Sequence, residues 1–448
     1  MNPYIPTTAN DRAEMLRAIG LESAAALFAD IPAEIRLADG LALDAPKSEY
    51  EVLAEASARA AKNRPAAQMP CFLGAGVYDR LVPAAVRPLT QRQEFLTAYT
   101  PYQPEISQGT LQAIFEFQTL VCSLFGMDVA NASMYDGPSA CAEAALMAVR
   151  HTGRRALLVS ALLHPEARAA VDAYAQFNGI DIVTLPEKDG ITDKDAAVSA
   201  LLNNENVAGV LIQAPNFLGV VEDLRPFAEA CHAAKGLLLS YTADPAALAL
   251  FESPGAMGAD IAVGEGQSFG IGMGFGGPHL GLMAAKQPLM RKLPGRIVGE
   301  TVDTRGRRAY VLTLQAREQH IRREKATSNI CSNQGLNALT MTIHLSLLGG
   351  SGLREVAEQS YAKAHFLRDR LAELGFAPRT DAPFFDEFAV RLPVETALTA
   401  DALNAKLLEK SFLGGYALGE KEWLVAVTEK RTRAEMDAFV CAIKEALS

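Results

Sequence analysis

Short apolar runs alternate with longer amphipathic segments through the middle of this chain. Between about residues 71 and 330 the apolar runs have the length of strands, at 156–160, 181–185, 207–213, 237–242, 260–263 and 280–284. The segments between them, such as 165–177 and 224–235, have the length of helices. This alternation predicts βα units arranged around a largely parallel sheet.

The two ends of the chain have different patterns. Residues 1–70 look helical and peripheral, and a capping box is spelled at Ser48-Glu-Tyr-Glu51. After residue 335 the order is helix, strand, helix, strand, helix, at 353–374, 387–392, 400–408, 423–428 and 433–447. The sequence therefore predicts a helical N-terminal arm (1–70), a large α/β domain (71–334) and a small α+β C-terminal domain (335–448).

The charge and the apolar runs exclude some partners. The formal net charge is -10, so no excess of Lys and Arg is present to neutralise nucleic-acid phosphates. No run approaches the ~18 apolar residues of a membrane span, and the N-terminus lacks a basic region followed by an apolar core. We expect a cytoplasmic protein with neither a nucleic-acid nor a membrane partner.

The sequence lacks the signatures of several common chemistries. Its six cysteines include no C-x-x-C pair and no histidine at metal-ligand spacing, so we expect no metal site and reduced, mostly buried thiols. A G-x-S-x-G elbow, a P-loop and an H-E-x-x-H motif are all missing. Hydrolase and nucleoside-triphosphatase functions therefore have no support.

A glycine-rich stretch at 264–281 is the most distinctive local feature. Eight of its eighteen residues are glycine, so the backbone closely approaches a ligand or another chain there. The layout resembles a pyridoxal-phosphate active-site loop, but no lysine occurs between Lys235 and Lys286, and Gln267 stands at the expected Schiff-base position. An amide cannot form an imine with an aldehyde, so covalent chemistry on this scaffold would have to be done elsewhere.

Three further segments contain candidate binding residues. Tyr135-Asp-Gly-Pro-Ser-Ala140 is either an ordinary strand-to-helix turn or a helix N-terminus whose free amides hold a phosphate. The segment 98–109 is stiffened by two prolines and carries tyrosines suited to a substrate or interface contact, or it is purely structural. The segment 317–334 has side chains able to bind carboxylate or phosphate, namely Arg317, His320, Arg322, Arg323 and Lys325.

Four motifs together carry a family resemblance. They are Tyr-Thr-Pro-Tyr-Gln-Pro-Glu at 99–105, Gly-Met-Gly-Phe-Gly-Gly-Pro-His at 272–279, Pro-Gly-Arg-Ile-Val-Gly at 294–299, and Arg-Glu-Gln-His-Ile-Arg-Arg-Glu-Lys-Ala-Thr-Ser-Asn-Ile-Cys at 317–331. With them the chain resembles the glycine cleavage system P-protein family, and within it the first subunit of the two-subunit form. The likeness runs from residue 9 to the C-terminus.

The resemblance implies a fold-type-I pyridoxal-phosphate architecture, similar to aspartate aminotransferase, assembled as an α2β2 heterotetramer. The complex of this family decarboxylates glycine and passes the aminomethyl group to the lipoyl arm of H-protein. The family's catalytic subunit carries His-Lys-Thr before a similar glycine-rich loop. The resemblance therefore implies that the partner subunit holds pyridoxal phosphate, and that this chain completes the active site without a covalent role.

The resemblance also implies roles for individual residues. It puts Tyr99, Tyr102 and Glu105 near the shared active site and the 317–331 segment close to the subunit contact. The pyridinium-pairing acid of the fold has no clear equivalent, since the nearest acid after the strand 237–242 is Asp244. A vestigial phosphate and cofactor loop comprises Asp136, Gly137, Ser139, Gly274, Gly276, Gly277 and His279.

Two alternatives remain open at this point. The chain could be a self-sufficient pyridoxal-phosphate lyase or transferase that uses Lys325 or Lys286 for its imine. It could also be a binding or scaffold protein without any link to catalysis. The first alternative predicts that the lone chain forms an imine, and the second predicts that changes at Tyr99 or Tyr102 leave the complex fully active.

Overall fold

The computed structural model describes residues 4–37, 40–96 and 100–448, so Tyr99 lies outside the described residues. The chain divides into two compact units, Met1–Pro65 and Ala66–Ser448. The predicted end of the N-terminal arm at residue 70 and the predicted domain boundary after residue 334 stay predictions.

The first unit consists of short helices whose side chains are exposed. It contains α1 (Ala9–Ala18) and α2 (Glu49–Ala60), with 3₁₀ turns between them. Capping boxes begin both helices, and the predicted pair Ser48 and Glu51 is confirmed at α2. None of the described residues of this unit is buried. The unit therefore has no apolar core of its own in the described part of the chain.

The second unit is built on a seven-stranded sheet with the order β1-β9-β8-β7-β6-β2-β3. Neighbouring strands from β3 to β8 run parallel, while β9 is antiparallel to both β8 and β1. The prediction of a largely parallel sheet is confirmed. The strands are β1 (Val129–Ala130), β2 (Ala156–Ser160), β3 (Asp181–Leu185), β6 (Val207–Gln213), β7 (Leu237–Thr242), β8 (Ile261–Glu265) and β9 (Gly281–Ala285).

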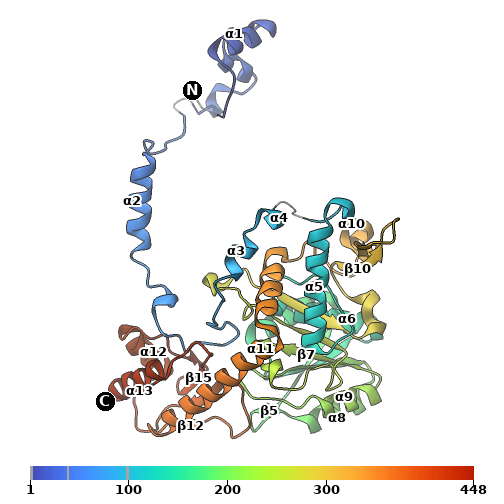
Figure 1. Cartoon of the computed structure of the whole chain (residues 1–448), viewed down its shortest axis with the longest axis vertical. Helices are drawn as coiled ribbons and strands as arrows, with labels where there is room; N and C mark the ends of the chain where they lie inside the picture. The colour runs from blue at the N-terminus through green and yellow to red at the C-terminus, as the bar shows by residue number, and fades with distance from the viewer. Residues whose placement is uncertain (1–3, 38–39, 97–99) are drawn as a thin grey trace. The chain divides into compact units, whose positions relative to one another are not determined.

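Helices cover both faces of this sheet (Figure 1). Alternate residues of a strand point to opposite faces, so Leu158 packs into one core and Leu157 into the other. The first core contains side chains of α5 (Gln108–Phe125), α8 (Lys194–Asn203), α9 (Arg225–Ala233) and α11 (Gly335–Ala372). The second core contains side chains of α6 (Gly137–Thr152) and α7 (Pro165–Asn178).

The C-terminal part of the chain forms a smaller antiparallel sheet with the order β12-β13-β15-β14. Its core surrounds the fully buried Trp423 and Phe439. The long helix α11 contributes to this core with Leu367 and to the large-sheet core with Met341, and its helical geometry breaks at Gly349. The elements are β12 (Ala377–Pro378), β13 (Glu387–Arg391), α12 (Ala400–Glu409), β14 (Tyr416–Ala417), β15 (Glu422–Ala426) and α13 (Arg433–Leu447).

Smaller elements complete the second unit. Two hairpins are formed by β4 (Glu187–Lys188) with β5 (Ile191–Thr192) and by β10 (Ile297–Val302) with β11 (Arg308–Thr313). Short helices are α3 (Val86–Thr90), α4 (Gln93–Leu96) and α10 (Gln319–Arg322). No helix among the described residues has both the length and the apolar character of a membrane span.

The cysteines only partly follow the sequence prediction. All six are free thiols, as predicted. Only Cys71, Cys141 and Cys231 are buried, however, so the expectation that most of them would be buried is wrong. Cys331 and Cys441 are exposed because they lie in a surface segment and on the outer side of α13.

Candidate functional site

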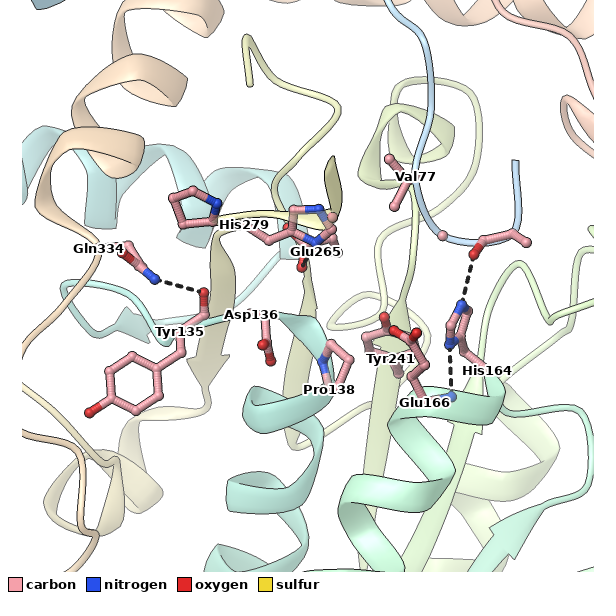
Figure 2. Close-up of a pocket in the computed structure, with 14 residues that line it drawn as sticks. Val77, Tyr135, Asp136, Pro138, His164, Glu166, Tyr241, Glu265, His279 and Gln334 are labelled. Carbon is pink, nitrogen blue, oxygen red and sulfur yellow. Dashed lines mark hydrogen bonds and ion pairs between the residues drawn. The ribbon is translucent and has the colours of Figure 1, made fainter. Parts of the chain in front are cut away.

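A polar pocket of about 210 Å³ lies at the carboxyl ends of the parallel strands (Figure 2). This edge of an open α/β sheet is where ligands bind in such folds. β7 and β8 end beside the pocket, and α6 and α7 begin there. The lining residues are Ala75, Gly76, Val77, Tyr135, Asp136, Pro138, His164, Glu166, Tyr241, Glu265, Gly276, Pro278, His279 and Gln334.

The N-terminus of α6 is already capped by carboxylates of this chain. The Asp136 side chain accepts a hydrogen bond from the Ser139 amide at 2.7 Å. The Gly137 amide donates to Glu265 Oε2 at 2.8 Å, and Pro138 has no amide hydrogen to offer. A β-carbon on Gly137 would lie 2.8 Å from the Tyr241 hydroxyl, so a larger residue would have to displace this buried side chain. The amides that the sequence suggested for a phosphate are thus occupied.

Glu265 connects three backbone segments at the end of β8. It is 3 % exposed and also accepts hydrogen bonds from the amides of Gln267 and Leu280, each at 3.0 Å. Burial raises the pKa of Glu265 to about 7, although the three amides act in the opposite direction. His279 Nδ1 lies 3.7 Å from Glu265 Oε2, and burial lowers the pKa of this histidine. The pocket therefore contains a carboxyl group able to exchange a proton near neutral pH.

Gln267 is buried behind this pocket, with 2 % of its surface exposed. Its Oε1 accepts a hydrogen bond from the Tyr78 amide at 2.9 Å, and its Nε2 donates to the carbonyls of Tyr78 at 3.1 Å and Ile271 at 2.8 Å. The side-chain amide thus pairs with the backbone of Tyr78 as a neighbouring strand would. A lysine can donate hydrogen bonds but cannot accept one, so it could not make this pair.

Tyr78 belongs to a segment, residues 71–81, that we call the strap. The strap begins beside the small sheet, where the Phe72 carbonyl accepts a hydrogen bond from the Ala426 amide of β15 at 2.9 Å. Further along, the Ala75 amide and the Tyr78 hydroxyl donate to Glu387 at 2.6 and 3.0 Å. Burial raises the pKa of Glu387 to about 7. The strap therefore connects the pocket to the first residue of β13.

The strap ends in a buried ionic cluster around Arg80. Its guanidinium pairs with Asp244, with Asp386 at 2.5 Å and with Glu429 at 2.6 Å, and every side chain in the cluster is at most 7 % exposed. Asp244 is the acid nearest the end of β7. Because Arg80 binds Asp244, this carboxylate is not available to a ligand in the pocket.

The predicted site residues fall into two separate groups. Asp136, Gly276 and His279 line the pocket, and Gly137 and Ser139 lie directly behind Asp136. Tyr102 and Glu105 do not line it: both are exposed on the segment before α5. Gly274, Gly276 and Gly277 all have a positive φ, in a loop that holds Phe275 fully exposed.

The predicted basic segment has an anchored part and an exposed part. Arg317 donates to the carbonyls of Leu293 and Gly295, and burial lowers its pKa. Arg322, Arg323 and Lys325 are exposed, and so is His320, which lies 3.8 Å from Glu318. Arg317 therefore holds the segment in place, while Arg322, Arg323 and Lys325 present positive charge to solvent.

Neither candidate lysine faces the pocket. Lys286 follows β9 and pairs with Asp260 at 3.2 Å. Gly281, at the other end of β9, pairs with Glu265 beside the pocket, so Lys286 lies at the opposite edge of the sheet. Among the described residues that line the pocket there is no lysine.

Several residues of the site were not found from the sequence. Glu265 lies two positions before Gln267, which was the one available signal for it. Tyr78, Arg80 and Glu387 come from distant parts of the chain, and only the folded arrangement brings them together. No group of three or more His, Cys, Asp or Glu side chains suited to a metal occurs in the described part of the chain.

Comparison with known proteins decides the family. The family model described as "Glycine cleavage system P-protein" matches residues 2–443. This chain belongs to the glycine cleavage system P-protein family. A P-protein relative from Geobacillus thermodenitrificans (strain NG80-2), named "Probable glycine dehydrogenase (decarboxylating) subunit 1", is 50% identical over 448 residues, with 98% of each chain covered.

Solved structures agree with the P-protein assignment. The crystal structure of glycine decarboxylase (P-protein) of the glycine cleavage system, in an inhibitor-bound form, matches with a TM-score of 0.89 and 47% identity, covering 99% of this chain and 100% of that one. An alanine–glyoxylate aminotransferase from Nostoc sp. has a TM-score of 0.62 at 16% identity, over 86% of this chain and 96% of that one, which bears on the fold alone. The fold is that of the fold-type-I pyridoxal-phosphate enzymes, so the predicted family and fold are confirmed.

Proposed function

We propose that this chain is the lysine-less subunit of a two-subunit glycine decarboxylase, which decarboxylates glycine and transfers the aminomethyl group to the lipoyl arm of H-protein. The observation that carries this proposal is the state of Gln267. By the family resemblance it stands at the lysine position of the loop, and its side chain is buried and binds the strap through its amide. The chain is therefore active only together with a sister subunit that supplies the missing lysine.

The residues around the pocket do not fit pyridoxal phosphate. The amides of Gly137 and Ser139 are bound by carboxyl groups, and Asp136, together with Glu265 in its ionised form, would repel a phosphate at that place. Asp244 is paired with Arg80, so it cannot bind a protonated pyridine nitrogen. These contacts support a complex in which the sister subunit alone holds the cofactor, which supplies the electron sink for loss of CO2.

The contribution of this chain is non-covalent. Fold-type-I active sites lie at subunit interfaces, so we assign to Tyr99, Tyr102 and Glu105 the role of completing the sister's site. The exposed cations of the basic segment would attract the acidic H-protein. The complex would be an α2β2 heterotetramer, with glycine and the lipoyl arm as its substrates.

Borohydride trapping tests where the cofactor binds. The chain is purified alone and together with its sister, pyridoxal phosphate is added, and the imine is reduced. We expect the label on the sister only. A label on this chain alone would overturn the proposal and favour the self-sufficient enzyme. The labelled peptide would then be expected to contain Lys286 or Lys325.

Charge reversal tests the H-protein surface. The double variant Arg322→Glu and Arg323→Glu should raise the apparent KM for H-protein and weaken its dependence on salt, because electrostatic steering is lost. Arg354→Glu, an exposed arginine on α11, is the matched control. If turnover with H-protein is unchanged in the double variant, the docking assignment is removed while the subunit assignment stands.

A further inference from the structure

Arg296 lies immediately before β10, in the turn of the motif at 294–299, and is 4 % exposed. Its guanidinium donates from Nη1 to Asn333 Oδ1 at 3.2 Å and from Nη2 to the Cys331 carbonyl at 2.9 Å. The ring of Tyr102 covers it, with the ring centroid 5.6 Å from the guanidinium carbon. Arg296, itself in the motif at 294–299, thus contacts one residue in each of two other family motifs, Tyr102 and Cys331, and also Asn333 just after the last motif.

The turn that carries Arg296 is itself held on several sides. Arg317 donates to the Gly295 carbonyl at 2.6 Å, and Asn131 Nδ2 donates to the Pro294 carbonyl at 3.0 Å. The Ala132 amide donates to the carbonyl of Arg296 at 2.8 Å. These hydrogen bonds hold the carbonyls of residues 294, 295 and 296, so the backbone that carries the Arg296 guanidinium has a defined position.

The partners of Arg296 are neutral. No ion pair within the described ranges includes Arg296, in contrast to Arg80, which binds three carboxylates. Its charge is therefore left to attract the electron-rich face of the Tyr102 ring. Tyr102 is nevertheless 59 % exposed, and its ring also meets His320 edge-on at 6.5 Å. A buried cation thus supports an aromatic side chain that is largely open to solvent.

We infer that Arg296 is a positioning residue, which fixes Tyr102 and the 331–334 segment where they complete the sister subunit's active site. This inference rests on the proposed function. A planar guanidinium donates to two separate acceptors from two different nitrogens and still offers a flat face to a ring, whereas an ammonium has a single nitrogen and no flat face. Lysine at this position is therefore expected to fail although it keeps the charge.

The test uses the reconstituted complex of this chain, its sister and H-protein. Arg296→Met and Tyr102→Leu should each lower kcat/KM for glycine by roughly 10- to 100-fold, because small displacements in an active site have effects of that size. The double variant should be little worse than the more severe single variant, since both changes break the same contact. Arg296→Lys should not restore activity, while Tyr102→Phe, which keeps the ring, should retain most of it.

Two controls keep the test decisive. Arg433→Met removes another arginine stacked on an aromatic ring, at 3.9 Å from Phe366, and should leave kcat/KM unchanged. The visible spectrum of the sister's cofactor on glycine addition should be altered by Arg296→Met and Tyr102→Leu but not by this control. A purely structural role would lower stability without changing that spectrum.

The outcomes separate this inference from the function on which it rests. If the wild-type pair is active and Tyr102→Leu keeps full kcat/KM, the positioning role is wrong and this chain is favoured as a scaffold, while the activity of the pair still supports a two-subunit glycine decarboxylase. Additive effects of Arg296→Met and Tyr102→Leu would also overturn it. If the wild-type pair does not decarboxylate glycine, the proposed function itself fails. Tyr102 is exposed, so its variants test the inference even where Arg296→Met does not fold.

Discussion

Restoring a lysine at position 267 should destabilise this chain rather than make it a catalyst. In Gln267→Lys the new ammonium can still donate to the carbonyls of Tyr78 and Ile271, which Gln267 Nε2 now contacts at 3.1 and 2.8 Å. It cannot accept the hydrogen bond that the Tyr78 amide makes with Oε1 at 2.9 Å. One buried backbone donor is therefore left without its partner.

The magnitude follows from the burial of the site. Gln267 is 2 % exposed, and an unpaired buried donor costs about 1–3 kcal/mol. The ammonium is also buried, and the groups that the Gln267 side chain now contacts are backbone amide and carbonyl groups rather than carboxylates, which adds to the cost unless the lysine is neutral. We expect a loss of roughly 2–4 kcal/mol, a large part of the 5–15 kcal/mol that is typical for the whole free energy of unfolding.

Two measurements check this prediction on the isolated chain. Urea denaturation gives the free energy of unfolding of the variant and of the wild type, which are compared on the condition that both have the same dependence on urea concentration (m-value). Borohydride trapping after addition of pyridoxal phosphate reports any imine. We expect lower stability and no trapped cofactor, since the amides of Gly137 and Ser139 remain occupied. A Gln267→Lys protein of unchanged stability that traps pyridoxal phosphate would refute the reasoning.

Two further variants separate the parts of the effect. Gln267→Met removes both donation and acceptance at similar size without adding a charge. Gln267→Glu keeps an acceptor for the Tyr78 amide but sets a carboxylate against two carbonyls when it ionises, so its stability should fall as pH rises. If Gln267→Met is as stable as wild type, the amide pairing contributes little and the cost in Gln267→Lys comes from the charge.

Three other outcomes are expected. The pKa of Glu387 in the folded chain, about 7, lies above its usual 4.5, so folding takes up a proton between these values. The stability from this group is therefore present below about pH 4.5 and is lost as pH rises through about 7, by up to roughly 1.4 kcal/mol per pH unit. Glu387→Gln should remove this pH dependence of the free energy of unfolding, as measured by urea titrations. Arg80→Met should lower the free energy of unfolding by about 3–5 kcal/mol because it leaves buried carboxylates unpaired. The control Arg92→Met, which changes a side chain that is 58% exposed, should alter the free energy of unfolding by less than ~0.5 kcal/mol in the same assay. Lys286→Met combined with Lys325→Met should leave the imine band of the complex unchanged, and a lost band would argue for the self-sufficient enzyme.

The sequence predicted most strands of the large sheet well because they are buried on both faces, whereas the edge strand β3 is mostly exposed. Continuous apolar runs such as Val207–Gln213 contrast clearly with the helices between them, so β2, β3, β6 and β7 have the predicted limits. The strands predicted to begin at Asp260 and Leu280 begin one residue later in the structure, at Ile261 and Gly281. Asp260 and Leu280 belong to the turns that precede these strands, and a hydropathy pattern does not distinguish the last residue of a turn from the first residue of a strand.

The candidate site could be predicted only in its local parts. The turn at Asp136 and the glycine-rich loop were found because their residues are close together in the chain. The contact between Gln267 and Tyr78 spans 189 positions, and that between Tyr78 and Glu387 spans 309. No pattern of spacing or periodicity encodes such pairs, so the strap and the Arg80 cluster became visible only in the folded chain.

The three places where a cofactor would bind are each satisfied by this chain itself. Carboxylates cap the α6 amides, Arg80 binds the nearest acid of β7, and the strap takes the amide of Gln267. A site that had merely lost its lysine would retain free amides and an unpaired acid. The internal pairing instead gives each of these groups a stabilising role in the subunit. Because the three sets of contacts are held by different residues, no single substitution would be expected to restore cofactor binding, and the lysine variant is the sharpest test of that argument.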